Sequence, residues 1–472
     1  LQFDVSRQPV QPHMDLLPLR AVYEPQRYPK AGDPNADVHL GIVAPKGGGT
    51  RWLDPRGTRE HLLARVHWAP DSTALWVQRL NRVQNQIELV ALDAKSGMSN
   101  VVLHEQDPYW LNIGDEFRFL KSSAEFLWAS ERDGFRHLYR YAANGKLLAK
   151  LTSGDWQVTA VAGVDEARGA LYYVSTEPSP LERQLHRTNL DGAGRSRLTR
   201  AAGTHAVTMA PDCEHYIDDY TSLPTPPRRL IHRTGEANGS VIADPNRPLM
   251  DRHEFLPAEI VELKAPDGAL LYGRLTRPAG FRKDRKYPAI VRVYGGPGAQ
   301  IATHAWTGFR WEQVMAQRGF VIWEMDNRGS AGRGHKWEAE LYRRLGAREL
   351  EDQQAGVRHL ISLGFVDPER IGIQGWSYGG YMTLYSLFHA PDLFRAGIAG
   401  ASLADWRNYD TIYTERYLGL PSENENGYRE SSPIHSVANL KAKLLVIHNF
   451  EDDNVLFQNA FQLADALQKA GK

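Results

Sequence analysis

The sequence contains one cysteine, no net charge and no long apolar run. Cys213 on its own excludes an internal disulfide framework, although it does not fix the compartment. Because the formal net charge is +0 at pH 7, nothing in the overall charge favours a nucleic acid or an anionic membrane as a partner. No apolar run approaches the roughly eighteen residues that a membrane helix requires. The chain begins with Leu1 rather than methionine, so the lack of an apolar leader says nothing about export.

What the chain does have is length and a repeat. Its 472 residues exceed the usual size of one hydrophobic core, which favours two or three domains. The first part reads as short strands separated by turns, and five of these strands carry an aligned leucine. The leucines stand 49, 49, 47 and 45 residues apart, at Leu40, Leu89, Leu138, Leu185 and Leu230. An all-β period of this length is typical of a β-propeller; a series of unrelated hairpins is the alternative.

The pattern changes after about residue 250. Apolar strands at 286–294, 320–325, 396–399 and 443–448 accompany helical patterns at 350–363 and 457–469. Near-continuous apolar strands that alternate with helices indicate a mostly parallel sheet covered on both faces. We therefore predict a partial propeller over residues 1–250 and an α/β domain over residues 251–472.

One motif in the second part points to chemistry. A short apolar run leads into Gly375-Trp376-Ser377-Tyr378-Gly379, a G-x-S-x-G pattern, and a helical pattern follows. Strand, sharp turn and helix with serine at the apex form the nucleophile elbow of α/β-hydrolases. The glycines leave room for the cramped turn that exposes the Ser377 hydroxyl. A chance G-x-S-x-G in a loop is the alternative.

A serine nucleophile also needs an acid that orients its base. In α/β-hydrolases the order along the chain is serine, acid, histidine, and the acid follows a later strand. Asp452 directly follows the strand at 443–448 and is our choice, with Asp453 and Glu451 as near rivals. The alternative is that these acidic residues are ordinary charged side chains of a solvent-exposed loop.

Two groups are candidates for stabilising an oxyanion. One is the backbone N–H of Tyr378, directly after the serine. The other is the hydroxyl of Tyr294, in the Gly-rich loop Val293-Tyr-Gly-Gly-Pro-Gly298. A neutral phenol can donate a hydrogen bond to a developing negative charge. An aromatic side chain that only packs the loop is the alternative.

The sequence offers no histidine in the expected place. None of the twenty residues after Asp452 is a histidine. His448 precedes the acid and suits a structural role in the turn, and three others stand in the wrong chain order for this fold: His335, His389 and His435. Either the chain is cut short or it has no triad.

With these motifs assembled, the chain resembles the dipeptidyl peptidase IV branch of the prolyl oligopeptidase family. The resemblance runs from Tyr28-Pro-Lys-Ala-Gly32 to the last residue. Its most specific parts are Gly375-Trp-Ser-Tyr-Gly-Gly-Tyr381 and Asp410-Thr-Ile-Tyr-Thr-Glu-Arg-Tyr-Leu-Gly-Leu-Pro421, with support from Asp452-Asp-Asn-Val455.

The resemblance implies an eight-bladed propeller that caps an α/β-hydrolase domain, with the active site between them. It implies a serine peptidase that needs no cofactor or metal and releases dipeptides from peptides with a free N-terminus, preferring proline or alanine as the second residue. By residue, it matches Ser377 to the nucleophile, Asp452 to the acid, and Tyr294 with the Tyr378 N–H to the oxyanion donors. It also implies a substrate-binding set: Trp406, Tyr409 and Tyr413 of the proline pocket, Asn454 at the substrate backbone, and Arg416 beside it.

The sequence also departs from the family. Five units are visible where the family has eight blades, and no Glu-Glu dipeptide is present for the substrate ammonium. We expect the catalytic histidine some thirty residues beyond Lys472, so a polypeptide that ends at Lys472 should be almost inactive.

The resemblance favours a homodimer and, weakly, a periplasmic or otherwise exported location, although the compartment itself stays open. A related tripeptidyl, acylaminoacyl or endo-acting peptidase, an esterase, and a non-catalytic propeller binding protein remain alternatives.

Overall fold

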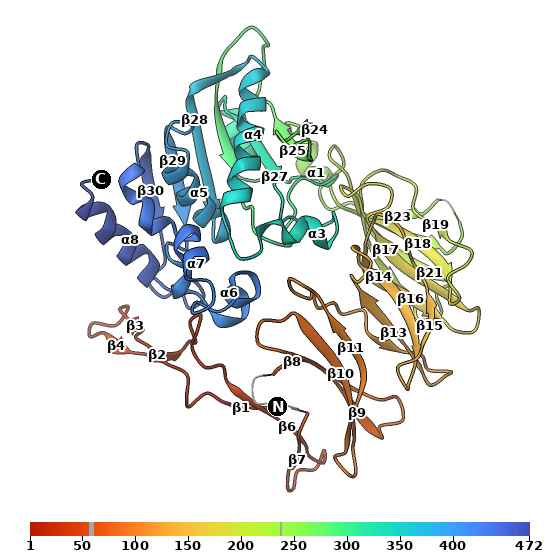
Figure 1. The fold of residues 1–472 in the computed structure, drawn as a ribbon. Helices are drawn as coiled ribbons and strands as arrows, with labels where there is room; N and C mark the ends of the chain where they lie inside the picture. The colour runs from red at the N-terminus through yellow and green to blue at the C-terminus, as the bar shows by residue number, and fades with distance from the viewer. Residues whose placement is uncertain (56–60, 237) are drawn as a thin grey trace.

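The computed structural model describes residues 1–55, 61–236 and 238–472 of the chain. Figure 1 shows two parts: antiparallel sheets, coloured red to yellow-green, and a larger sheet with helices, coloured green to blue. The two parts lie against each other, with α3 and α6 on the side of the second part that faces the first. Among the described residues, no helix combines the length and the apolar character needed to cross a bilayer.

Four of the antiparallel sheets have four strands each, in the order in which the chain supplies them. The first sheet holds β8 (Leu62–Trp68), β9 (Ala74–Leu80), β10 (Gln86–Asp93) and β11 (Ser99–Gln106). The second holds β12 (Arg118–Phe119), β13 (Glu125–Ser130), β14 (His137–Ala142) and β15 (Leu147–Lys150). The third holds β16 (Val158–Asp165), β17 (Ala170–Ser175), β18 (Gln184–Asn189) and β19 (Ser196–Arg197). The fourth holds β20 (Thr204–Met209), β21 (His215–Thr221), β22 (Arg228–Arg233) and β23 (Ser240–Ala243).

A fifth unit stands at the start of the chain. Its three strands, β1 (Gln2–Asp4), β6 (Asp37–Ile42) and β7 (Arg51–Leu53), pair in the order β1-β6-β7. Between β1 and β6 lie two short antiparallel pairs, β2 (Val10–Gln11) with β5 (Gln26–Arg27) and β3 (Met14–Asp15) with β4 (Val22–Tyr23).

The five-unit repeat is confirmed. The five aligned leucines lie on β6, β10, β14, β18 and β22, the corresponding strand of each unit. Four of them are buried: Leu40, Leu89, Leu138 and Leu185. Successive sheets share apolar clusters; one joins Trp76 of β9 to Phe126 of β13. Each blade buries its apolar faces against neighbouring blades, so similar strands must recur at regular intervals along the chain.

The second part is built on a seven-stranded sheet in the order β24-β25-β27-β26-β28-β29-β30. Its strands are β24 (Ala258–Lys264), β25 (Leu270–Thr276), β26 (Tyr287–Arg292), β27 (Val321–Asp326), β28 (Val366–Trp376), β29 (Ala396–Gly400) and β30 (Lys443–Ile447). The strands from β27 to β30 pair in parallel, whereas β24 and β25 are antiparallel. The partial propeller and the mostly parallel α/β-hydrolase sheet are therefore both confirmed.

Helices connect these strands. They are α1 (Arg247–Met250), α2 (Trp311–Gln317), α3 (His335–Glu338), α4 (Ala347–Ser362), α5 (Tyr378–His389), α6 (Thr411–Leu418), α7 (Glu425–Ser431) and α8 (Gln458–Lys469), with 3₁₀ turns η1 (Ala339–Leu341), η2 (Trp406–Asn408) and η3 (Pro433–Asn439). α5 packs on β28 and β29, and α4 packs on β27 and β28. α4 begins three residues before the predicted Leu350, because Glu349 accepts the N–H of Gly346 and caps the helix.

Candidate active site

Ser377 occupies the tight turn between β28 and α5. Its backbone has φ 58° and ψ −120°, a strained conformation for a residue with a side chain. The turn is held on both sides, since the Ser377 N–H donates to the Gly400 carbonyl at 2.9 Å and the Ser377 carbonyl accepts the Tyr381 N–H at 2.9 Å. The strand–turn–helix arrangement expected from the sequence is thus present, and Ser377 is half-buried at its apex.

The two glycines of the motif are required by close backbone contacts. A Cβ on Gly375 would lie 2.3 Å from the Gly379 carbonyl oxygen and 2.5 Å from the Val293 carbonyl oxygen. A Cβ on Gly379 would lie 2.3 Å from the same Val293 oxygen. The end of β26 therefore runs so close to the turn that any side chain would push Ser377 out of place.

Tyr378 sits directly behind the turn and is anchored by a buried acid. Its hydroxyl donates to Glu349 Oε1 at 2.7 Å, and that oxygen also accepts the Gly346 N–H at 3.0 Å. Burial raises the pKa of Glu349 to about 7, although these two hydrogen bonds partly offset the rise. Sequence reasoning missed Glu349, because an acid in the first turn of a helix ordinarily signals only capping.

Tyr294 lies beside the turn, directly after Val293. The Val293 N–H donates to the Gln374 carbonyl at 2.9 Å, which ties this segment to β28. The rings of Tyr294 and Tyr378 lie 6.1 Å apart between centroids. Burial raises the pKa of Tyr294, so its phenol keeps the proton that a hydrogen-bond donor needs.

Asp452 lies in the turn after β30. Its Oδ1 accepts the backbone N–H groups of Asn454 at 3.1 Å and Val455 at 2.9 Å, which fixes the carboxylate within the turn. β28, β29 and β30 run parallel and adjacent, so the Ser377 turn and the Asp452 turn emerge at the same edge of the sheet. The two rivals, Glu451 and Asp453, are exposed.

The histidines of the second part have other partners. His448 Nε2 lies 2.6 Å from the Val455 carbonyl oxygen and 3.5 Å from Asp452 Oδ2, so it supports the turn. His389 Nδ1 faces the Tyr385 carbonyl at 3.0 Å. His335 Nε2 lies 3.1 Å from Asp107, a propeller residue, and His435 is exposed on η3.

Three aromatic residues expected to form a substrate pocket come together. The rings of Trp406 and Tyr413 are stacked with 6.1 Å between centroids, and Tyr409 meets Tyr413 edge-on at 5.4 Å. They come from different elements: Trp406 is in η2, Tyr413 is in α6, and Tyr409 lies between. The set also touches the turn, because Trp406 lies 5.7 Å from the Tyr378 ring.

Asn454 and Arg416 are both tied to neighbouring residues. The Asn454 side-chain oxygen accepts the Tyr409 hydroxyl at 3.1 Å, and its backbone carbonyl accepts the Tyr28 hydroxyl at 2.8 Å. Arg416 Nε donates to Gln84 of the propeller at 2.8 Å. Asn454 therefore lies next to the aromatic set, whereas Arg416 connects α6 to the propeller.

The arrangement combines a strained serine, neutral donors beside it, an anchored carboxylate and an aromatic wall. Such groups can form and stabilise a covalent acyl intermediate.

Within the described ranges, no group of three His, Cys, Asp or Glu side chains is arranged to hold a metal ion. Two propeller residues that contact α6, Gln84 and Trp110, escaped sequence reasoning because no local pattern marks them.

Comparison with known proteins gives two family matches. Residues 1–227 match the dipeptidyl peptidase IV (DPP IV) N-terminal region, and residues 307–472 match the prolyl oligopeptidase family. Mouse dipeptidyl peptidase 8 is 31% identical over 94% of this chain and 59% of its own length. The probable dipeptidyl peptidase 4 of Aspergillus flavus is 31% identical over 94% of this chain and 60% of its own length.

Solved structures agree with these matches. Crystalline dipeptidyl peptidase 4 of Porphyromonas gingivalis superposes with a TM-score of 0.94 at 32% identity, covering 99% of this chain and 67% of that one. A putative dipeptidyl aminopeptidase IV of Bacteroides ovatus gives 0.92 at 30% identity, covering 100% and 70%. The chain thus spans about 60% of the length of the curated relatives that it matches.

Proposed function

This chain belongs to the prolyl oligopeptidase family, and from that premise we propose that the whole protein is a serine exopeptidase that releases dipeptides from free peptide N-termini. We further propose that it prefers proline or alanine as the second residue of the substrate. The relatives are named dipeptidyl peptidases, and a propeller that packs over the hydrolase part suits short peptides rather than folded proteins.

The observation that carries the proposal is the position of Ser377 next to a cluster of aromatic side chains. Its φ of 58° places it at the apex of the turn, and Trp406 packs against the next residue, Tyr378. Tyr413 is half-buried and stacks on the fully buried Trp406, so we propose that the Tyr413 ring presents the apolar surface to the substrate. A proline ring is itself flat and apolar and has no N–H that would need a partner.

In the proposed reaction, Ser377 Oγ attacks the carbonyl carbon after the second substrate residue. A histidine oriented by Asp452 takes the serine proton, and the carbonyl oxygen becomes an oxyanion. The Tyr378 N–H and the Tyr294 hydroxyl donate hydrogen bonds to that oxygen. The C–N bond then breaks, the histidine gives its proton to the leaving amine, and water releases the dipeptide from Ser377.

Asn454 and Arg416 are proposed to bind the substrate backbone. The Asn454 side-chain oxygen already accepts the Tyr409 hydroxyl, which leaves its NH₂ group free to donate to a substrate carbonyl. Arg416 donates to Gln84 through two of its nitrogens, and we propose that its remaining guanidinium N–H groups donate to the substrate.

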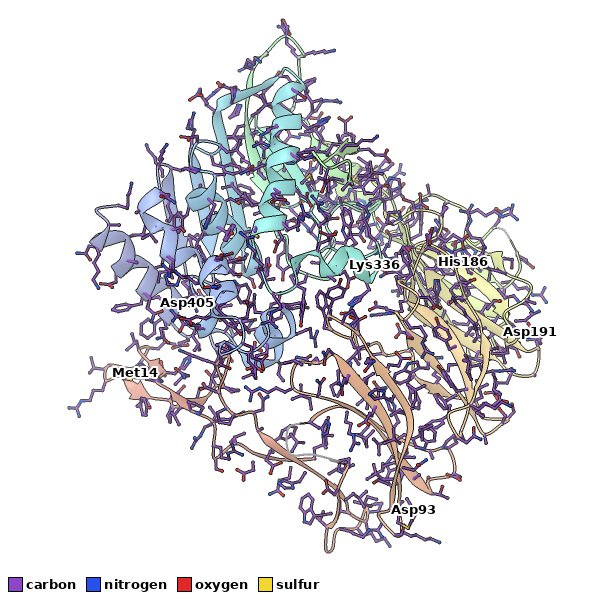
Figure 2. The ribbon with its side chains drawn as sticks, viewed as in Figure 1. Met14, Asp93, His186, Asp191, Lys336 and Asp405 are labelled. Carbon is purple, nitrogen blue, oxygen red and sulfur yellow. The ribbon has the colours of Figure 1, made fainter. Side chains whose placement is uncertain are left out.

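We also propose that the protein forms a homodimer through the β3–β4 hairpin. Leu16, Leu17 and Leu19 are 54%, 90% and 103% exposed, a concentration of apolar surface that favours contact with a second copy. Figure 2 shows Met14 on this hairpin, projecting from the side of the molecule that carries Asp405. Light scattering should give a dimer for the native protein and a monomer for Leu17→Glu; a monomer in both would refute this assembly.

We divide the chain between residues 250 and 251. The last blade strand, β23, ends at Ala243, and α1 ends at Met250. The first strand of the large sheet, β24, begins at Ala258. Limited proteolysis should cut first between β23 and β24 if this boundary is right, and early cuts inside a blade would argue against it.

The full-length protein provides the test of the activity. We expect it to cleave glycyl-prolyl-4-nitroanilide, to cleave an N-acetylated analogue at least about a hundredfold more slowly, and to be labelled on Ser377 by a fluorophosphonate. Rapid cleavage of the acetylated substrate would favour an acylaminoacyl or endo-acting peptidase. Release of tripeptides would favour a tripeptidyl peptidase, and a native protein that neither cleaves nor labels would favour a binding protein.

A further inference from the structure

α6 is the helix that carries Tyr413 and Arg416, and much of its support comes from the propeller. Its first turn is capped within the hydrolase part, since the Asp410 carboxylate accepts the Tyr413 N–H at 2.8 Å. Other contacts cross to residues more than three hundred positions earlier in the chain: Gln84 lies 332 residues from Arg416. Figure 1 shows α6 at the edge of the hydrolase part closest to β8.

Gln84 binds α6 at two points with one side chain. It lies in the turn between β9 and β10, is 1% exposed, and has φ 60°. Its Nε2 donates to the Ile412 carbonyl at 2.5 Å, and its Oε1 accepts from Arg416 Nε at 2.8 Å. A carbonyl can only accept and a guanidinium can only donate, so only one orientation of the amide satisfies both partners.

Trp110 supports the same helix through its aromatic ring. It is 1% exposed and is packed in the hydrophobic core of the hydrolase part. Its ring meets Tyr417 edge-on at 5.0 Å, and Tyr417 meets Tyr413 edge-on at 4.9 Å. The indole N–H donates to Asn112 at 3.0 Å, which fixes the ring's orientation.

The two supports are joined to each other. The N–H of Leu111, the residue after Trp110, donates to the Gln84 carbonyl at 2.8 Å. The Gln84 N–H in turn donates to the Asn81 carbonyl at 3.0 Å. The segments of Gln84 and Trp110 are therefore linked through the backbone, and together they contact a polar and an aromatic side chain of α6, Arg416 and Tyr417.

We propose that Gln84, supported by Trp110, is a positioning residue of the proline pocket, so that the propeller sets the selectivity between proline and alanine at the second substrate position. The proposal rests on the proposed function. In the proposed pocket, a proline ring should contact Tyr413 over a wider area than an alanine methyl group. One methylene group more or less in an apolar pocket is worth about 10–200-fold in selectivity, so a small outward shift of α6 should affect proline far more than alanine.

The test compares kcat/KM for glycyl-prolyl- and glycyl-alanyl-4-nitroanilide in the full-length protein. Gln84→Met keeps the side-chain length but removes the three side-chain hydrogen bonds to α6, one to the Ile412 carbonyl and two from Arg416. We expect it to lower the proline-to-alanine ratio about tenfold, chiefly through KM for the proline substrate. Trp110→Phe, which keeps an aromatic ring but loses the indole N–H, should lower the ratio in the same direction.

Gln184→Met is the matched control. Gln184 is another fully buried propeller glutamine, but it binds Glu182 and the Ala201 carbonyl within its own blade and makes none of the contacts with α6. A variant that only loosens the fold reduces the active fraction and lowers both substrates together. Gln184→Met should therefore lower the melting temperature and leave the ratio unchanged.

The outcomes separate this inference from the proposed function. If the native protein cleaves neither substrate, the proposed function fails and this inference fails with it. If the native protein prefers proline but Gln84→Met and Trp110→Phe keep its ratio within about twofold, the proposed function stands and the positioning role is refuted. A fall in the ratio of Gln184→Met equal to that of Gln84→Met would also refute it.

Discussion

The hydroxyl of Tyr378 donates a 2.7 Å hydrogen bond to Glu349, a side chain with no solvent exposure. The residue after the proposed nucleophile is thereby anchored twice, through its backbone in the first turn of α5 and through its hydroxyl at the start of α4. Because Gly346 donates to the same carboxyl oxygen, Glu349 joins the helix that packs behind the sheet to the turn that presents Ser377.

The first prediction concerns this acid. The pKa of Glu349 is raised to about 7 in the folded chain from a usual 4.5, so the folded state binds the proton more tightly than the unfolded state. The resulting stabilisation is complete below pH 4.5 and is lost as the pH rises to 7, a change on the order of 3 kcal/mol. In urea unfolding, the stability of Glu349→Gln should fall less over this pH range than that of the native protein, by about this amount.

The matched control for that experiment is Glu351→Gln. Glu351 lies on the same helix, but its side chain is exposed and pairs with Arg348. It should keep the native dependence on pH. An identical fall between pH 4.5 and 7 in Glu349→Gln would mean that Asp326, whose pKa burial raises to about 6, accounts for the effect instead.

The second prediction concerns strain at Ser377. Its φ of 58° with ψ −120° costs about 1–3 kcal/mol for a residue with a Cβ. Ser377→Gly should therefore raise the free energy of unfolding by about 1 kcal/mol after the entropy of glycine is counted, whereas Ser377→Ala should leave it within about 0.5 kcal/mol. Both should lower kcat by roughly 10⁶-fold in the full-length protein. Loss of stability in Ser377→Gly would show that the turn is not strained.

The third prediction compares two glycines of the same strand. A methyl group on Gly375 would meet the Gly379 carbonyl oxygen at 2.3 Å, whereas one on Gly372 would find its nearest atom at 3.6 Å. Gly375→Ala should lower the free energy of unfolding by about 1–3 kcal/mol and reduce labelling of Ser377. Gly372→Ala should do neither, and equal effects in the two variants would contradict the proposed clash.

The fourth prediction concerns His335, which joins the two parts of the chain. Its backbone N–H donates to the Gly134 carbonyl at 2.8 Å, and its ring nitrogens Nε2 and Nδ1 lie 3.1 Å from Asp107 and 3.4 Å from Glu131, respectively. Burial alone lowers the pKa of His335, but the hydrogen bond with Asp107 and the nearby carboxylates outweigh it and raise the pKa to about 10. The ring is therefore charged at neutral pH.

This raised pKa stabilises the fold fully below pH 6.5, and the stabilisation is lost as the pH rises towards 10. The free energy of unfolding of the native protein, measured by thermal unfolding, should fall over that range by as much as about 5 kcal/mol relative to that of His335→Gln. His215→Gln, at an exposed blade position, should behave like the native protein. If the free energy of unfolding depended on pH in the same way in the native protein and in His335→Gln, the ring would be neutral in the folded chain.

The fifth prediction tests the proposed substrate contact of Asn454. Tyr409→Phe removes the hydroxyl that orients the Asn454 amide, so kcat/KM for dipeptide substrates should fall about two- to tenfold. Tyr220→Phe removes a comparable hydroxyl, which donates to the Ala202 carbonyl in the propeller, and should leave kcat/KM unchanged. If Tyr409→Phe and Tyr220→Phe had the same kcat/KM, the proposed contact between Asn454 and the substrate would be refuted.

Much of the fold was predictable because it follows from short-range rules. The strand before Ser377, the glycines around it and the helix after it lie within about twenty residues, and β28 and α5 confirm them. The spaced leucines predicted the units of the propeller for the same reason, since each occupies the equivalent strand of its own sheet. The roles assigned to individual site residues stay predictions.

The sequence by itself determined that a serine stands at a cramped strand-to-helix turn and that short β units repeat before it, because backbone sterics and apolar periodicity act over neighbouring residues. Only the tertiary structure decided that Glu349 lies behind the turn and that Gln84 and Trp110 hold α6. Those contacts join residues far apart in the chain, and a lone glutamine or tryptophan carries no sign of its distant partner. The packing of α4 behind the turn and of the propeller against α6 created these relationships, so they became visible only once the chain was folded.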